Sequence, residues 1–161
     1  MSTYRSLLLL LTVGLIATSP VVADVTEPTK TLNAMKMATI AKMYQQDVSN
    51  EGMDNPVVLQ QYANTDLQAA MQLEQDYFDK EQLSCHVGYD VLWDAQDPDY
   101  EQDKQFSMTE QGLVKVSLAQ GSNIYYQLSC DADGKENCQV AEVILNEDGK
   151  SLRQHFLETC R

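Results

Sequence analysis

The stretch Gly112-Leu-Val-Lys-Val-Ser-Leu118 lies within the region that decides the fold. Val114, Val116 and Leu118 alternate with polar residues, so we expect their side chains to face a core. Similar short runs, rich in β-branched and aromatic residues, lie at Gln105–Thr109, Asn123–Cys130 and Cys138–Leu145. Polar turns separate these runs, at Glu110–Gly112, Gln120–Ser122 and Asp131–Asn137. Successive short strands with tight connections predict an antiparallel meander.

The residues on either side of this region have helical spacing. Apolar side chains recur at near-helical intervals from Lys30 to about Val48, and Val57–Tyr62 is expected to form a short helical turn. Thr65-x-x-Gln68 resembles a capping box and predicts a helix to about Leu83. Ser151–Thr159 predicts a short closing helix. We therefore expect an α+β fold, with N-terminal helices packed on a curved antiparallel sheet of about four strands and a short C-terminal helix.

The first 23 residues have the pattern of a secretory signal. Arg5 precedes an apolar run, Ser19-Pro20 ends the run, and Val21-Val-Ala23 provides a cleavage site. A membrane span is the alternative, but it needs about 20 apolar residues and this run is shorter. We expect cleavage after Ala23, a flexible leader over residues 24–29, and a single domain over residues 30–161. The predicted location is the periplasm of a Gram-negative-type bacterium, or the medium, with no stable membrane anchor.

Cys85, Cys130, Cys138 and Cys160 agree with export to an oxidising compartment. Four cysteines allow three pairings. Cys130–Cys138 is the economical choice because it closes the base of a hairpin loop, which leaves Cys85–Cys160. The zinc alternative is disfavoured because no two cysteines have the C-x-x-C spacing. We predict no metal and no cofactor.

The charge of the chain excludes some partners. Arg5 is the only charged residue of the first 23, so the remainder carries 10 basic and 24 acidic residues, a net charge of −14. Such a surface repels nucleic acids and anionic membranes, and it attracts cationic proteins. Solubility alone explains the charge equally well. The oligomeric state is left open.

Two acidic segments contain candidate partner-binding residues. Carboxylates surround Trp93 and Tyr100, and they could form a solvated loop, a partner surface or a catalytic pair. Trp93 is expected in the core, although an exposed Trp93 would suit a binding anchor. The disulfide-closed loop begins like a calcium site but lacks its third acidic ligand and its terminal Glu. The partner-binding candidates are Trp93, Asp97, Asp99, Tyr100, Asp131, Asp133 and Glu136.

A pocket is the alternative kind of site. We take Tyr44, Tyr125, Tyr126 and His86 as candidates to line a pocket between the helices and the sheet. His86 and His155 would lie in one neighbourhood if Cys85 pairs with Cys160. The chain has no Gly-x-Ser-x-Gly, no H-E-x-x-H and no phosphate-binding loop, so no catalytic residue is predicted.

Tyr89-Asp-Val-Leu-Trp-Asp-Ala-Gln-Asp-Pro-Asp-Tyr100 and Asp148-Gly-Lys-Ser-Leu-Arg153 resemble segments of a family of secreted bacterial proteins of unknown function. That family has a nuclear-transport-factor-2-like fold. The resemblance covers about residues 60–157 and includes Val140–Ile144 as a closing strand. It implies a curved sheet with helices closing a cone, and it carries over no catalytic residue. The cysteines, and the lack of a Trp in the penultimate strand, depart from the family pattern.

These observations favour an exported, non-catalytic binding protein. It would act as an acidic inhibitor or immunity-type protein for a cationic protein, such as a cell-wall hydrolase or a toxic effector. The alternative is a small-molecule-binding or enzymatic protein with its site between the helices and the sheet.

Overall fold

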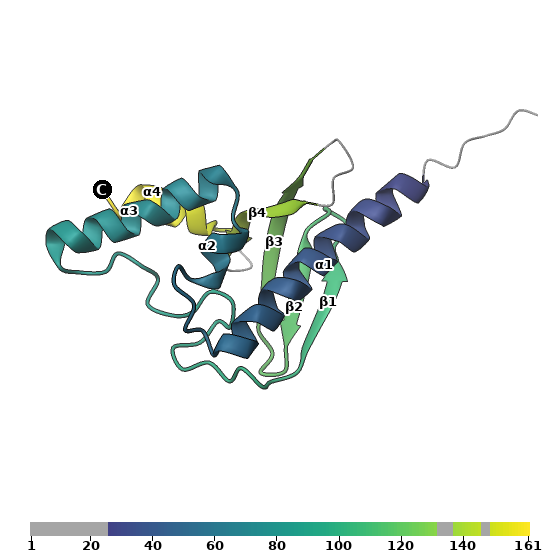
Figure 1. The fold of residues 1–161 in the computed structure, drawn as a ribbon, viewed down its shortest axis with the longest axis horizontal. Coiled ribbons are helices and arrows are strands. Elements are labelled where there is room, and N and C mark those ends of the chain that lie inside the picture. Colours follow the sequence, from purple (N-terminus) through teal and green to yellow (C-terminus); the bar gives the residue numbers. More distant parts are fainter. Residues whose placement is uncertain (1–25, 132–136, 146–148) are drawn as a thin grey trace, which may run out of the picture.

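The computed structural model describes residues 26–131, 137–145 and 149–161 of the chain (Figure 1). The predicted signal peptide, residues 24 and 25 of the predicted leader, Asp133 and Glu136 lie outside these residues, whereas residues 26–29 are helical and do not form the expected flexible leader.

The sheet is a four-stranded antiparallel meander in the order β1-β2-β3-β4. Its strands are β1 (Lys104–Met108), β2 (Val114–Leu118), β3 (Asn123–Cys130) and β4 (Cys138–Ile144). Phe106 pairs with Val116, and Val116 pairs with Ile124. The predicted strands and their connectivity are thus confirmed.

One face of the sheet is covered by α1 (Thr26–Asn50), which lies across the strands in Figure 1. Val114, Val116 and Leu118 are buried on β2, as their alternation predicted. Ile40 and Tyr44 of α1 have no exposed area. The apolar stripe of the helix and the apolar face of the meander therefore form one core.

Three further helices lie beside the sheet, next to β4 (Figure 1). They are α2 (Val58–Tyr62), α3 (Thr65–Glu81) and α4 (Leu152–Thr159), and α3 packs against α4. Leu152 and Phe156 are the buried residues of α4, which is the closing helix that the sequence predicted. Together these elements confirm the predicted α+β class.

The start of α3 corrects one detail of the prediction. Asn64, and not Thr65, is the N-cap, because its side chain accepts a hydrogen bond from Leu67 N at 3.0 Å. The Gln68 side chain donates to Gln60 O instead of completing a capping box. The reason is tertiary, since Asn64 N donates to Val140 O of β4 at 2.8 Å and this bond places the extended residue before the helix.

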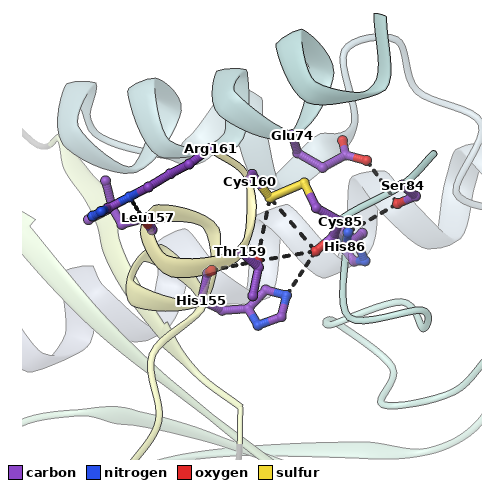
Figure 2. The surroundings of a disulfide bond; sticks show 9 residues. All are labelled: Glu74, Ser84, Cys85, His86, His155, Leu157, Thr159, Cys160 and Arg161. Carbon is purple, nitrogen blue, oxygen red and sulfur yellow. Dashed lines mark hydrogen bonds between the residues drawn. A yellow bond between two sulfur atoms is a disulfide. The ribbon is translucent and has the colours of Figure 1, made fainter. Parts of the chain in front are cut away.

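Both predicted disulfides are present. Cys130–Cys138 joins the end of β3 to the start of β4, with 4.0 Å between the Cα atoms. Cys85–Cys160 joins the segment after α3 to the end of α4, with 5.4 Å between the Cα atoms (Figure 2). Within the described ranges, no helix is long and apolar enough to cross a membrane.

Candidate functional site

The predicted tyrosine-lined pocket is filled by packed side chains. Tyr44 and Tyr126 have no exposed area, and their hydroxyl oxygens are 2.8 Å apart. Tyr44 also donates to Leu92 O at 2.5 Å, and burial raises the pKa of both tyrosines. Side chains without exposed area do not line a ligand pocket, so the prediction is wrong for Tyr44 and Tyr126. Tyr125 is the neighbour of Tyr126 on β3 and belongs to the opposite face of the sheet. It is partly exposed, and Lys115 lies over its ring.

Trp93 occupies the core, as its default interpretation predicted. It is fully buried, and its indole Nε1 donates to Asp47 Oδ2 at 2.6 Å. Its ring packs edge-on against Tyr44 and Tyr100, with centroids 5.3 and 5.4 Å apart. Because Trp93 is inaccessible, it is not available as a partner-binding anchor. Tyr100 remains partly exposed.

The segment after Trp93 is a loop with a defined path, which we call the acidic loop (residues 94–103). Asp90 N donates to Ala95 O at 2.9 Å before the loop, and Ala119 N donates to Asp103 O at 2.9 Å at its end. Within it, Asp99 Oδ1 accepts from Glu101 N at 3.0 Å. Five carboxylates of the loop are exposed, and none forms an ion pair with a described residue: Asp94, Asp97, Asp99, Glu101 and Asp103.

The second acidic candidate lies at the base of the β3–β4 hairpin. Asp131 is exposed, and its backbone N donates to Asn137 O at 3.4 Å beside the Cys130–Cys138 bond. The candidates Asp133 and Glu136 lie between these positions, outside the described residues.

A small cavity of about 200 Å³ lies beside the C-terminal part of α1, and we call it the Asp47 cavity. Its walls come from α1, α2, α3, α4 and the segment 86–92. They are mainly apolar, but Asp47, His86 and Asp90 also line it. A more open groove of about 710 Å³ runs between α1 and the start of β4. Its charged residues, Lys42 and Asp131, are exposed, whereas the Asp47 cavity contains the buried Asp47 and the partly buried His86 and Asp90.

The ionisable groups of the Asp47 cavity are perturbed by burial. Asp47 is 3% exposed, and burial raises the pKa of its carboxyl despite the Trp93 hydrogen bond; nearby Asp90 and Asp54 raise it further. Burial also raises the pKa of Asp90, whose Oδ1 accepts from Leu92 N at 2.8 Å. Burial lowers the pKa of His86. Such groups converging on an apolar cavity are typical of ligand sites.

Asp47 was missed by the sequence predictions, although the chain contains a signal for it. Ile40, Met43, Tyr44 and Asp47 follow the spacing of one helical face, so a carboxylate interrupts an apolar stripe. A charged residue in such a position is rarely buried without a partner or a function. The partner could not be predicted, because Trp93 is 46 residues away.

The Cys85–Cys160 bond brings the two histidines into one neighbourhood, as the pairing predicted (Figure 2). His155 Nε2 lies 3.0 Å from Cys85 O, and both imidazoles pack on Phe156 with centroid distances of 5.6 and 5.9 Å. Across the described residues, no group of three or more His, Cys, Asp or Glu side chains could hold a metal ion. The histidines are therefore interpreted as packing residues, with His86 also lining the Asp47 cavity.

The described residues form an α+β domain with two disulfides, an ordered acidic loop and a small cavity lined by ionisable side chains. No protein-family model, curated protein or solved structure matches this chain. The resemblance to nuclear-transport-factor-2-like proteins therefore stays a prediction.

Proposed function

We propose that this protein is an exported, non-catalytic binding protein whose acidic loop engages a cationic protein. The observation that carries the proposal is the set of five exposed carboxylates without ion pairs in the described structure, which follow one another over residues 94–103. Asp97, Asp99 and Tyr100 are the predicted binding residues that this loop contains. The hairpin at Asp131 would add to the same function from another part of the surface.

The support for the proposal is preorganisation. Trp93 anchors one end of the loop in the core, and Gln120 Nε2 holds Trp93 O at 2.8 Å. A loop that is already ordered loses little conformational entropy when it binds. Its unpaired charge would steer a basic partner and raise the association rate. The interaction should therefore weaken with added salt.

Two disulfides are compatible with an extracytoplasmic protein. Export through residues 1–23 to the periplasm, or to the medium, belongs to the proposal. In that setting a basic cell-wall hydrolase such as a lysozyme, or a toxic effector, is the expected type of partner. The protein would then act as an inhibitor or an immunity-type protein.

The direct test measures binding of the mature chain, residues 24–161, to lysozyme and to cytochrome c as basic probes. Serum albumin is the acidic probe. The loop variant carries Asp97→Asn, Asp99→Asn and Glu101→Gln. Its matched control carries Asp66→Asn, Asp76→Asn and Asp79→Asn on α3, which remove the same charge from exposed positions. Three exposed charge pairs at about 0.5 kcal/mol each predict roughly tenfold weaker binding for the loop variant.

The control variant should bind with less than about a twofold change, since it alters only the long-range field. Equal weakening by both variants would show that net charge alone determines binding. That result would contradict a role for the acidic loop. Failure of both lysozyme and cytochrome c to bind would contradict the proposal as well.

A further inference from the structure

The Asp47 cavity has a chemical character that the acidic loop does not explain. Asp47 is 3% exposed and lines the cavity, yet only its Oδ2 is engaged, by Trp93 Nε1. Its Oδ1 has no hydrogen-bond partner among the described residues. Asp90 also lines the cavity, and its carboxyl interacts with the backbone N–H groups of Leu92 and Trp93. Two carboxyl groups thus line one small cavity.

The charge of the cavity is not balanced by the protein. No Lys or Arg lines it, and burial lowers the pKa of His86, which favours the neutral imidazole. A buried carboxylate without a cationic partner is costly. A bound cation would relieve that cost at both aspartates.

The geometry favours one class of cation. Calcium and magnesium need six or more oxygen ligands, counting water, whereas these walls are mainly apolar. Guanidinium prefers to bind both oxygens of one carboxylate in a fork. An ammonium group is a compact charge with three rotatable donors, so it suits a cavity of about 200 Å³ that is lined by two separate carboxyl groups. Val58, Leu59 and Leu152 provide apolar walls for a hydrocarbon chain.

We infer that the Asp47 cavity binds a small primary ammonium group, which donates to the carboxyl groups of Asp47 and Asp90 while its hydrocarbon part packs on the apolar wall. The wall segment is held in place, because Cys85–Cys160 ties the chain just before His86 to α4 (Figure 2). This site is separate from the acidic loop, so either proposal can fail without the other.

The test is calorimetric titration of the oxidised mature chain with n-butylammonium chloride, a cation short enough for this volume. The neutral analogue 1-butanol and the anion butyrate are the comparison ligands. Nα-acetyl-lysine methylamide carries the same ammonium group on a peptide, and it distinguishes a lysine side chain of a partner from a free amine. We expect n-butylammonium to bind at least about tenfold more tightly than 1-butanol, because hydrogen bonds to charged groups are strong.

Asp47→Asn and Asp90→Asn each keep an oxygen acceptor for Trp93 Nε1 or Leu92 N, and each should weaken n-butylammonium binding about tenfold or more. Asp76→Asn, an exposed change on α3, is the matched control and should leave binding unchanged. Unfolding followed by circular dichroism checks that each variant is folded.

Val57→Trp tests the same cavity by filling it, whereas the aspartate variants change its charge. Val57 lines the cavity and is 50% exposed, so a larger side chain there should abolish binding without unfolding the domain. Equal affinity for n-butylammonium and 1-butanol would overturn the inference. So would full affinity in Asp47→Asn, or unchanged binding in Val57→Trp.

Discussion

Asp47 links the core, the acidic loop and the cavity through a single side chain. Its Oδ2 accepts the indole N–H of Trp93, the residue that precedes the loop. The same carboxyl lines the cavity beside Asp90. An acidic residue therefore holds the only tryptophan of the chain in place, at the cost of burying a charge. This cost should be visible in the pH dependence of stability.

Asp47→Asn tests that cost. The pKa of Asp47 is raised by burial, and by Asp90 and Asp54, so the folded protein holds this proton more tightly than the unfolded chain. Its contribution to stability is present below the ordinary pKa of 3.8 and is lost as the pH rises through the raised pKa. The Asn variant keeps an acceptor for Trp93 but does not titrate. We expect the difference in unfolding free energy between the Asn variant and the wild type to increase with pH. At neutral pH the variant should be the more stable of the two.

The measurement is urea unfolding followed by circular dichroism, from about pH 4 to about pH 7. Asp76→Asn is the control, and its stability should follow that of the wild type across the series. A constant difference between Asp47→Asn and the wild type would show that the Asp47 carboxyl does not titrate differently in the two states.

At the scale of the elements, local sequence patterns predicted the strands. Features that depart from these patterns are caused by tertiary contacts. Val114, Val116 and Leu118 alternate regularly, so β2 could be assigned from side-chain period alone. On β4 the register shifts opposite Gln127 and Leu128, and Glu142 becomes buried. Glu142 Oε1 then accepts from Arg153 N at 3.0 Å, in the first turn of α4. A β-bulge, and a strand carboxylate that accepts from the first turn of the next helix, leave no local pattern that sequence reasoning could detect.

The N-terminus of α3 allows a matched test of such a tertiary effect. Asn64→Ala removes the side-chain acceptor for Leu67 N but keeps the backbone bond to Val140 O. Loss of an N-cap costs about 1 kcal/mol, so we expect the unfolding free energy to fall by that amount. Thr65→Ala, which the sequence pattern had favoured as the cap, should change it by less than about 0.5 kcal/mol. A larger loss in Thr65→Ala than in Asn64→Ala would reverse the cap assignment.

For the molecule as a whole, the site depends on how the long segment between α3 and β1 is fastened. Cys85–Cys160 holds its start, Trp93 holds its middle, and the Asp103 carbonyl meets Ala119 N at its end. The pairing of the cysteines and the core position of Trp93 could be predicted from spacing and residue type. The cavity could not, because it forms where this segment meets four helices.

The two disulfides should differ in their contribution to global stability. Cys85–Cys160 spans 75 residues and Cys130–Cys138 spans 8. Closing the longer loop removes more entropy from the unfolded chain, about 4.5 kcal/mol against about 2.5 kcal/mol. We therefore expect Cys85→Ala/Cys160→Ala to lose more unfolding free energy in urea than Cys130→Ala/Cys138→Ala. Alanine is the suitable replacement because Cys160 and Cys138 are buried.

The same pair of variants separates global from local effects. Hydrogen exchange around residues 86–92 should accelerate in Cys85→Ala/Cys160→Ala, because this segment loses its covalent tie to α4. In Cys130→Ala/Cys138→Ala, faster exchange should appear at the ends of β3 and β4 and leave residues 86–92 protected. Equal loss of stability in the two variants, with equal exchange around residues 86–92, would mean that the Asp47 cavity is ordered by packing alone.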